Sequence, residues 1–177
     1  EMDSPLHVAC RMGQLNTVKV LISANADKNR KNKAGKTPLE IACECGHAEI
    51  VHELINAGAT VNQQEVVEIS CERGWLEVVK ILLSTKVMDD LKMIGTGLRA
   101  ASCHGHSDIV KHLLAMPCCG ENVDLGEAIK GAVVGNHIEV VDLLLKSGVN
   151  KESLGRGLVA AGQSDLQIVE ILLTAGA

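Results

Sequence analysis

The sequence predicts an all-α solenoid, in which helix–turn–helix units are stacked along the whole chain. Three observations support this fold class. A segment that reads as a turn between two helices recurs six times at a nearly constant spacing, an apolar stripe follows each turn, and aromatic residues are almost absent. We therefore expect one domain over residues 1–177, with approximate units at 3–35, 36–64, 65–95, 96–126, 127–154 and 155–177.

The recurring turn segment has the form CGHAEIV in its second copy, Cys45–Val51. Glycine or asparagine suits such a turn because a positive φ costs these residues little. Successive turn residues are 33, 28, 31, 31 and 28 positions apart, and the sixth turn is one residue short. These turn residues are Gly13, Gly46, Gly74, Gly105, Asn136 and Ser164.

The helices on either side of each turn differ in composition. The second helix repeats its apolar residues at i, i+1, i+4 and i+5, as in Glu77–Leu83, which places them on one face. The first helix carries small residues three and four positions before the turn residue, which allow the first helices of neighbouring units to pack closely. These pairs are Ala9/Cys10, Ala42/Cys43, Ser70/Cys71, Ala101/Ser102, Ala132/Val133 and Ala160/Ala161.

Composition limits the class of protein and its cellular location. One Trp, no Phe and no Tyr in a chain that is 46% hydrophobic indicate thin layers with an aliphatic core. The net charge of −5 does not indicate a nucleic-acid binder. Seven cysteines without a knot-like spacing indicate reduced thiols and an intracellular protein, cytoplasmic or nuclear. The sequence has no signal peptide and no apolar run of about 18 residues, so we expect no membrane insertion.

The first two units carry a recognisable motif. Ser4–Ala9 reads SPLHVA and Thr37–Ala42 reads TPLEIA, and the two units end in similar tails. With the period near 33, the chain resembles the ankyrin repeat family, whose signature is T-P-L-H-x-A. The resemblance covers nearly the whole chain, and it implies a β-hairpin finger between consecutive units.

Units three to six depart from this pattern because they lack the Thr-Pro that begins a helix well. Their shorter periods predict one full finger, between units one and two, and short or clipped fingers elsewhere. Residues 85–95 and 116–126 are expected to be irregular connections, the first of them with room for an extra helical turn within 87–94.

The resemblance implies that a partner protein lies against the fingers and the exposed side of the first helices. In this family the two residues before the turn glycine face that surface, and here they vary while the stacking positions stay small. Trp75 replaces the turn histidine, as an interface anchor or as a filler beside a shortened loop. The predicted partner-binding residues are Arg11, Met12, Arg30, Lys31, Lys33, Glu44, Cys45, Glu72, Arg73, Trp75, Cys103 and His104.

The finger segment Asp27–Lys36, DKNRKNKAGK, is strongly basic. It carries five cations and one carboxylate, so its net charge is +4 and that of the remaining chain is −9. Such a finger suits an acidic peptide, a phosphate-bearing partner or a nucleic-acid backbone. The alternative interpretation is a solvated loop without a ligand, because fingers of this family are commonly charged.

Other patterns suggest chemistry less strongly. The spacings Cys43-x-Cys45-x-His47 and Cys103-His104-x-His106 resemble metal ligands, but Cys43 is expected inside the stack and the turn histidines are expected to make structural hydrogen bonds. Cys118-Cys119 is a vicinal pair that could act in redox chemistry or be a bystander. No arrangement predicts catalysis, a metal or a cofactor.

The sequence thus favours an intracellular protein–protein interaction module that is not an enzyme, and a fragment of a longer protein. Its partner is another protein or peptide, or another domain of its own longer chain. One alternative is a regulatory or substrate-positioning arm of a larger multidomain enzyme or signalling protein, which flanking sequence would reveal. Another is binding of an anion or a nucleic acid through the basic finger, which a steep salt dependence would reveal.

Overall fold

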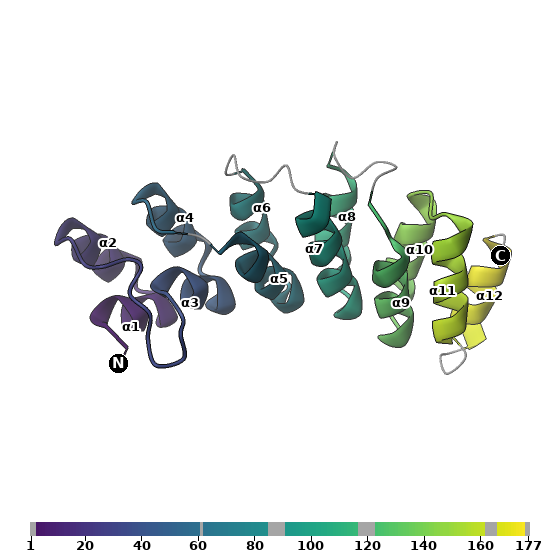
Figure 1. The fold of residues 1–177 in the computed structure, drawn as a ribbon, viewed down its shortest axis with the longest axis horizontal. Coiled ribbons are helices and arrows are strands. Elements are labelled where there is room, and N and C mark those ends of the chain that lie inside the picture. The colour runs from purple at the N-terminus through teal and green to yellow at the C-terminus, as the bar shows by residue number, and fades with distance from the viewer. Residues whose placement is uncertain (1–2, 61, 85–90, 117–122, 162–165, 176–177) are drawn as a thin grey trace. The chain divides into compact units, whose positions relative to one another are not determined.

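The computed structural model describes residues 3–60, 62–84, 91–116, 123–161 and 166–175. Within these residues all regular secondary structure is α-helical, in twelve helices (Figure 1). The chain divides into two compact units: residues 1–70 with 77–85 form the first, and residues 71–76 with 86–177 form the second. The predicted all-α fold class is confirmed.

The first unit is a stack of helix pairs. Helix α1 packs against α2 and α3, α3 packs against α4, and α2 also contacts α4. Each pair of helices is joined by a short turn, and a longer loop connects α2 to α3 (Figure 1). The unit contains α1 (Pro5–Arg11), α2 (Leu15–Ser23), α3 (Pro38–Cys45), α4 (Ala48–Asn56), most of α5 (Gln63–Arg73) and α6 (Leu76–Ser84).

The first helices of this unit begin where the Ser-Pro and Thr-Pro motifs predict. Ser4 caps α1, Thr37 caps α3, and proline follows each cap at the first helical position. Both caps are reciprocal, because the side chain of His7 or Glu40 turns back to the backbone N–H of the capping residue. These motifs therefore satisfy N–H groups that the helix itself leaves without an acceptor.

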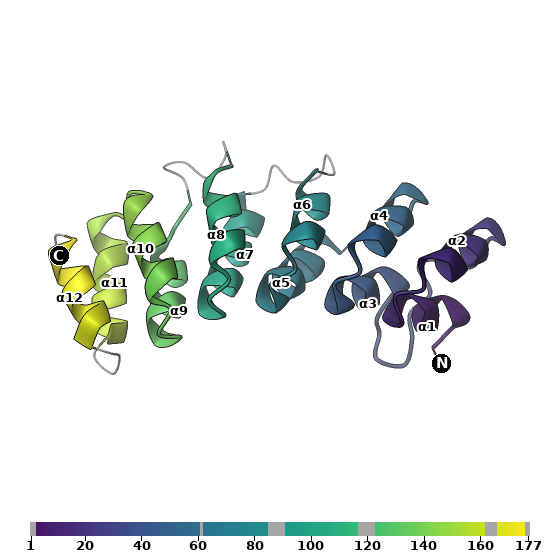
Figure 2. The ribbon, with the colours of Figure 1, turned by 180° about the vertical axis from the view of Figure 1, so that it is seen from behind.

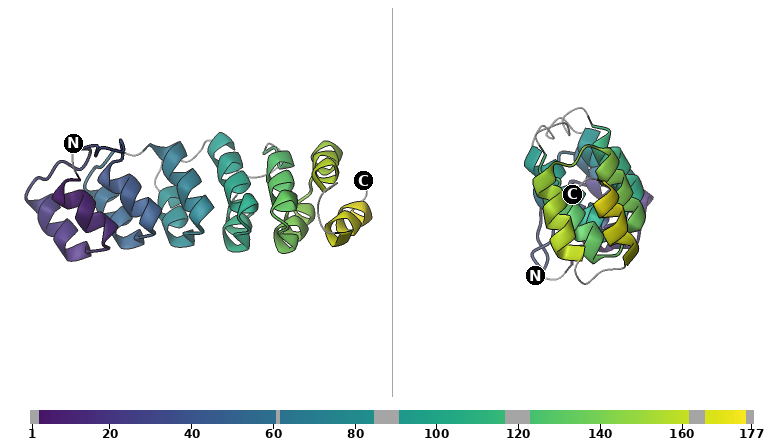
Figure 3. Two further views of the ribbon diagram at one scale, coloured as in Figure 1. Left: turned by 90° about the horizontal axis from the view of Figure 1, so that it is seen from below. Right: turned by 90° about the vertical axis from the view of Figure 1, so that its right-hand side faces the viewer.

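The second unit repeats the arrangement of paired helices. Helices α7, α9 and α11 contact one another in that order, and α8, α10 and α12 form the parallel row behind them (Figure 3). The unit contains α7 (Leu91–Cys103), α8 (Ser107–Leu114), α9 (Gly126–Val134), α10 (Ile138–Lys146), α11 (Lys151–Ala161) and α12 (Leu166–Thr174).

The prediction of an irregular connection over residues 85–95 is wrong in part. Residues 91–95 belong to helix α7 rather than to a connection, which agrees with the extra helical turn expected in this segment. Because no proline fixes their first position, the first helices of the second unit begin further before the turn residue than α1 and α3 do. Helix α11 follows Asn150, whose side-chain oxygen accepts the N–H of Ser153 at 2.8 Å. Residues 85–90 and 117–122, with Cys118-Cys119, lie outside the described residues.

The predicted turn residues adopt left-handed backbone conformations. Gly13, Gly46, Gly74 and Gly105 have φ between +68° and +79°, and Asn136 has φ +59°. Only glycine and, less readily, asparagine adopt this conformation at low cost. The turns between paired helices therefore lie where the sequence predicts them. The short sixth turn at Ser164 lies outside the described residues.

The stacking residues form the centre of each unit. Cys10, Cys43, Ala101 and Ala132 are fully buried, and so are nearly all their counterparts; Ala160 is half-buried. Burial raises the pKa of the Cys10 and Cys43 thiols to about 12, so both behave as small apolar groups.

The loop between α2 and α3 is the predicted long finger, although it contains no β-strand. Asn32 organises its tip. The N–H of Asn32 donates to the carbonyl of Lys36 at 3.0 Å, and its side-chain oxygen accepts the N–H groups of Ala34 and Lys36. At the other end, Asn29 accepts the N–H of Thr60 at 2.8 Å, which ties the finger to the next connecting loop.

Candidate interaction surface

Turn histidines hold the backbone of each preceding repeat. The Nε2–H of His47 donates to the carbonyl of Arg11 at 3.2 Å, and that of His137 donates to the carbonyl of Cys103 at 3.1 Å. His106 makes the same bond to Glu72 at 2.9 Å. The predicted structural role of these histidines is confirmed.

Each of these rings also occupies the space beside a turn glycine. A Cβ added to Gly13, Gly74 or Gly105 would lie within 2.8 Å of the imidazole of the next repeat. The histidine therefore fixes the carbonyl two residues before the turn glycine and fills the gap next to it. The bond is to the backbone, so it is the same for Arg11, Glu72 and Cys103 although their side chains differ.

In the first unit, two of the predicted partner-binding residues already have ionic partners. Arg11 donates to the carboxylate of Asp3, and Glu44 accepts the ammonium group of Lys36. Met12 is 65% exposed, while Cys45 is half-buried. Arg30, Lys31 and Lys33 are exposed on the finger.

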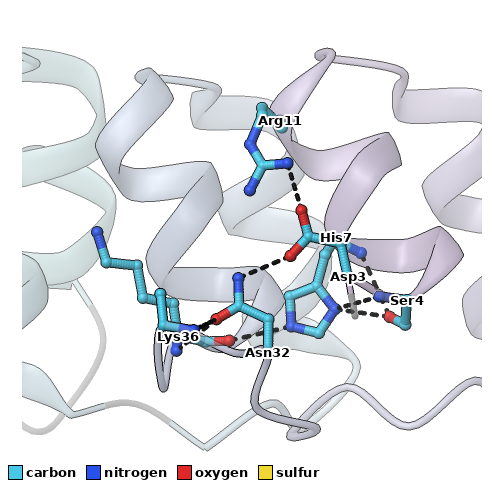
Figure 4. A network of polar contacts seen from close by, with 7 residues as sticks. Asp3, Ser4, His7, Arg11, Asn32 and Lys36 are labelled. Atoms are coloured by element: carbon cyan, nitrogen blue, oxygen red, sulfur yellow. Dashed lines mark hydrogen bonds and ion pairs between the residues drawn. The ribbon is translucent and has the colours of Figure 1, made fainter. Parts of the chain in front are cut away.

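A polar network joins the finger to α1 (Figure 4). The Nε2–H of His7 donates to the carbonyl of Lys36 at 3.0 Å, while its Nδ1 accepts the hydroxyl of Ser4 at 2.7 Å. Asn32 donates through its side-chain amide to Asp3 at 2.7 Å. A hydrogen bond from Arg11 and, to a smaller extent, one from Asn32 lower the pKa of Asp3, so its carboxylate remains charged in this network.

Sequence reasoning missed Asp3 and Asn32 as parts of this surface. The only sequence signals for them are weak: Asp3 precedes a capping serine, and Asn32 lies three residues before a glycine in a polar loop. Their contact joins residues 29 positions apart, so it depends on the path of the finger rather than on any local pattern.

In the second unit, the remaining predicted residues lie at the ends of first helices and in the turn that follows. Arg73 and His104 are exposed, Trp75 is 39% exposed, and Glu72 and Cys103 are half-buried. The ring of His104 stacks against that of His106, with centroids 6.2 Å apart and planes 10° apart.

The fifth repeat adds an apolar element to this set in the same unit. Val134, which holds the position equivalent to Cys103, is 69% exposed. The structure thus gathers the predicted residues into two sets, one on each compact unit.

The described residues hold no group of three or more His, Cys, Asp or Glu side chains arranged to bind a metal. Cys43, the first residue of one metal-like spacing, is buried in the stack, and the ring of His47 is directed to a backbone carbonyl. In the same part of the chain, no helix is long and apolar enough to cross a lipid bilayer.

Comparison with known proteins agrees with this architecture. Residues 1–65 match the family model for ankyrin repeats in three copies. The human ASB11 ankyrin repeat domain matches 99% of this chain over 85% of its own length, with 24% sequence identity and a TM-score of 0.84. The chain therefore has the ankyrin-repeat fold, and its first 65 residues match the model of that family.

Two further solved structures resemble this chain. The ankyrin repeat domain of Bcl-3, a member of the IkappaB protein family, covers 100% of this chain over 88% of its own, with 24% identity and a TM-score of 0.75. An ankyrin repeat domain from Acinetobacter baumannii AYE covers 98% of each chain, with 27% identity and a TM-score of 0.70. A comparison with curated proteins found no match. Ankyrin-repeat domains are generally protein–protein interaction modules.

Proposed function

We propose that this ankyrin-repeat domain recognises a partner protein through the finger and the ends of its first helices. The observation that carries the proposal is the bond from each turn histidine to a carbonyl of the preceding repeat. That bond keeps the backbone constant at the positions where the side chains differ most. A constant backbone that displays unlike side chains is what a recognition surface needs, because affinity depends on a few anchors rather than on contact area.

The two sets of residues supply different kinds of contact. The finger and α1 offer Lys31 and Lys33 together with exposed Met12. The second unit offers Arg73, and Trp75 as an aromatic anchor, a type of residue enriched in binding hot spots.

The experiment is an affinity capture from native cell extract with the wild-type domain and with Lys31→Glu, Arg73→Glu and Trp75→Ala. Two matched controls change similar exposed residues on second helices, Lys146→Glu on α10 and Val20→Ala on α2. We expect the captured set to shrink with the surface variants and to stay intact with the controls. A captured set that none of the three surface variants changes would refute the proposal.

The finger supports a narrower candidate, namely an acidic partner. The exposed cations Lys31 and Lys33 lie in a segment of net charge +4, whereas Lys36 is already paired with Glu44. A captured protein whose binding weakens steeply with salt, and is lost in the Lys31→Glu/Lys33→Glu double variant, would support this candidate. Binding that neither salt nor the double variant weakens would exclude it.

A further inference from the structure

A groove crosses the second helices of the first unit. It has a volume of about 540 Å³ and is lined by residues of α2, α4 and α6. Figure 2 shows the ribbons of these three helices. A smaller hollow of about 250 Å³ continues it along the turns before α2 and α4. Leu15, Ala48 and Glu49 line both hollows, so they form one continuous surface.

The groove has an apolar floor. Leu15, Ala48 and Ile81 are half-buried and contribute one apolar contact from each of the three helices. The combined volume matches that of clefts that hold ligands, and it is large enough for a few side chains of a peptide.

The rim of the groove is mainly acidic, which favours a basic ligand. Glu49, Glu53 and Glu77 line it, against a single lysine, Lys19. Lys19 pairs with Glu53 at 3.8 Å, and Glu77 pairs with Lys80 at 2.7 Å.

The carboxylate of Glu49 is different. It is exposed, and it has no ion pair or side-chain hydrogen bond among the described residues.

In the second unit, an ion pair occupies the positions that correspond to this rim. There, Lys111 of α8 pairs with Glu139 of α10 at 2.9 Å, across two neighbouring repeats. In the first unit, Glu77 holds the position equivalent to Glu139, and the position equivalent to Lys111 is His52. An imidazole therefore faces the groove where the second unit has an ammonium group.

We propose that this groove binds a basic amphipathic peptide segment of another protein. Its apolar side chains would cover Leu15 and Ile81, and its lysine or arginine side chains would pair with Glu49 and Glu77. This site is on the second helices, so it goes beyond the interaction proposed above and does not depend on it.

The test uses a fluorescein-labelled peptide of about 14 residues, in which Leu recurs at i, i+3, i+4 and i+7 and Lys fills the other positions, so that a helix has one apolar and one basic face. Fluorescence anisotropy measures its affinity for the intact domain at low and at physiological salt. One variant, Glu49→Gln, removes the uncommitted carboxylate. A second, His52→Lys, supplies the ammonium that Lys111 provides in the other unit. The matched control is Glu139→Gln on α10.

We expect Glu49→Gln/His52→Lys to bind the peptide about fivefold to tenfold more weakly than wild type, and added salt to reduce that difference. Glu139→Gln should bind like wild type.

Equal affinity in the double variant, an equal loss in Glu139→Gln, or no binding to wild type would each overturn the proposal. So would equally tight binding of a peptide with Ser in place of Leu or Glu in place of Lys. Circular dichroism of each variant confirms that it is folded, and all the substituted residues are on the surface.

Discussion

The contact between a turn histidine and the preceding turn glycine gives a sharp prediction for Gly105→Ala. Gly105 has φ +74°, and a Cβ built on it would lie 2.5 Å from Nδ1 of His137. Gly148 in the same unit has φ +91° and no atom within 4 Å of its built Cβ. Both glycines thus have a positive φ, but only at Gly105 would an added Cβ also collide with a neighbouring side chain.

The magnitudes follow from these two terms. A positive φ costs alanine roughly 1–2 kcal/mol, and overpacking costs about 1–3 kcal/mol. We therefore expect Gly148→Ala to destabilise the domain by about 1–2 kcal/mol, and Gly105→Ala by about 2–5 kcal/mol.

A double-mutant cycle separates the two terms. His137→Ala removes the ring and its 3.1 Å bond to Cys103, which alone costs about 1 kcal/mol or somewhat more. In the His137→Ala background, Gly105→Ala should cost no more than Gly148→Ala does. Urea unfolding followed by circular dichroism measures all five proteins. The reasoning would be refuted if the extra cost of Gly105→Ala persisted without the ring, or if the two glycine variants were equally stable.

Three further predictions concern packing, acid stability and thiol reactivity. Ala42→Leu should overpack the stack and lower the unfolding free energy by about 1–3 kcal/mol, so a melting temperature equal to that of wild type would contradict the stacking arrangement. A hydrogen bond from the N–H of Gly126 is the main cause that lowers the pKa of Asp124 below its ordinary value of 3.8. The charged carboxylate therefore stabilises the domain above pH 3.8, and this contribution is lost as the pH falls through the lowered pKa. Asp124→Asn should show a shallower loss of stability in acid, and a dependence of stability on acid pH equal to that of wild type would contradict this. Native alkylation followed by mass spectrometry should modify half-buried Cys45 well before fully buried Cys43, and equal rates would show that the stack opens.

Much of the fold could be predicted because each repeat encodes its own local structure. The turn at Gly46 needs a positive φ, and Thr37 with Pro38 specifies a helix start without reference to distant residues. Where such local signals are weak, the prediction was less accurate. Helix α7 begins at Leu91, inside a segment expected to be irregular, because no proline marks its first residue.

The candidate surface was less predictable because its ion pairs span the length of a helix and follow no local motif. Arg11 and Glu44 were predicted from their position before the turn glycine, but their pairing with Asp3 and Lys36 could not be predicted. Each pair joins a residue that precedes a first helix to a residue near the end of that helix, eight positions further along the chain. The repeat pattern therefore predicts the positions of Arg11 and Glu44 on their helices, but not the residues with which they pair.

The turn histidines also explain why Trp75 stands apart. Where the histidine is present, its ring lies against a glycine that has no room for a Cβ, and its N–H holds a carbonyl of the preceding repeat. Among the described turns before α4, α6, α8 and α10, the turn that carries Trp75 is the one without this histidine, and the chain divides into its compact units at residues 71–76. The departure from the repeat pattern and the boundary between the two compact units therefore fall at the same turn.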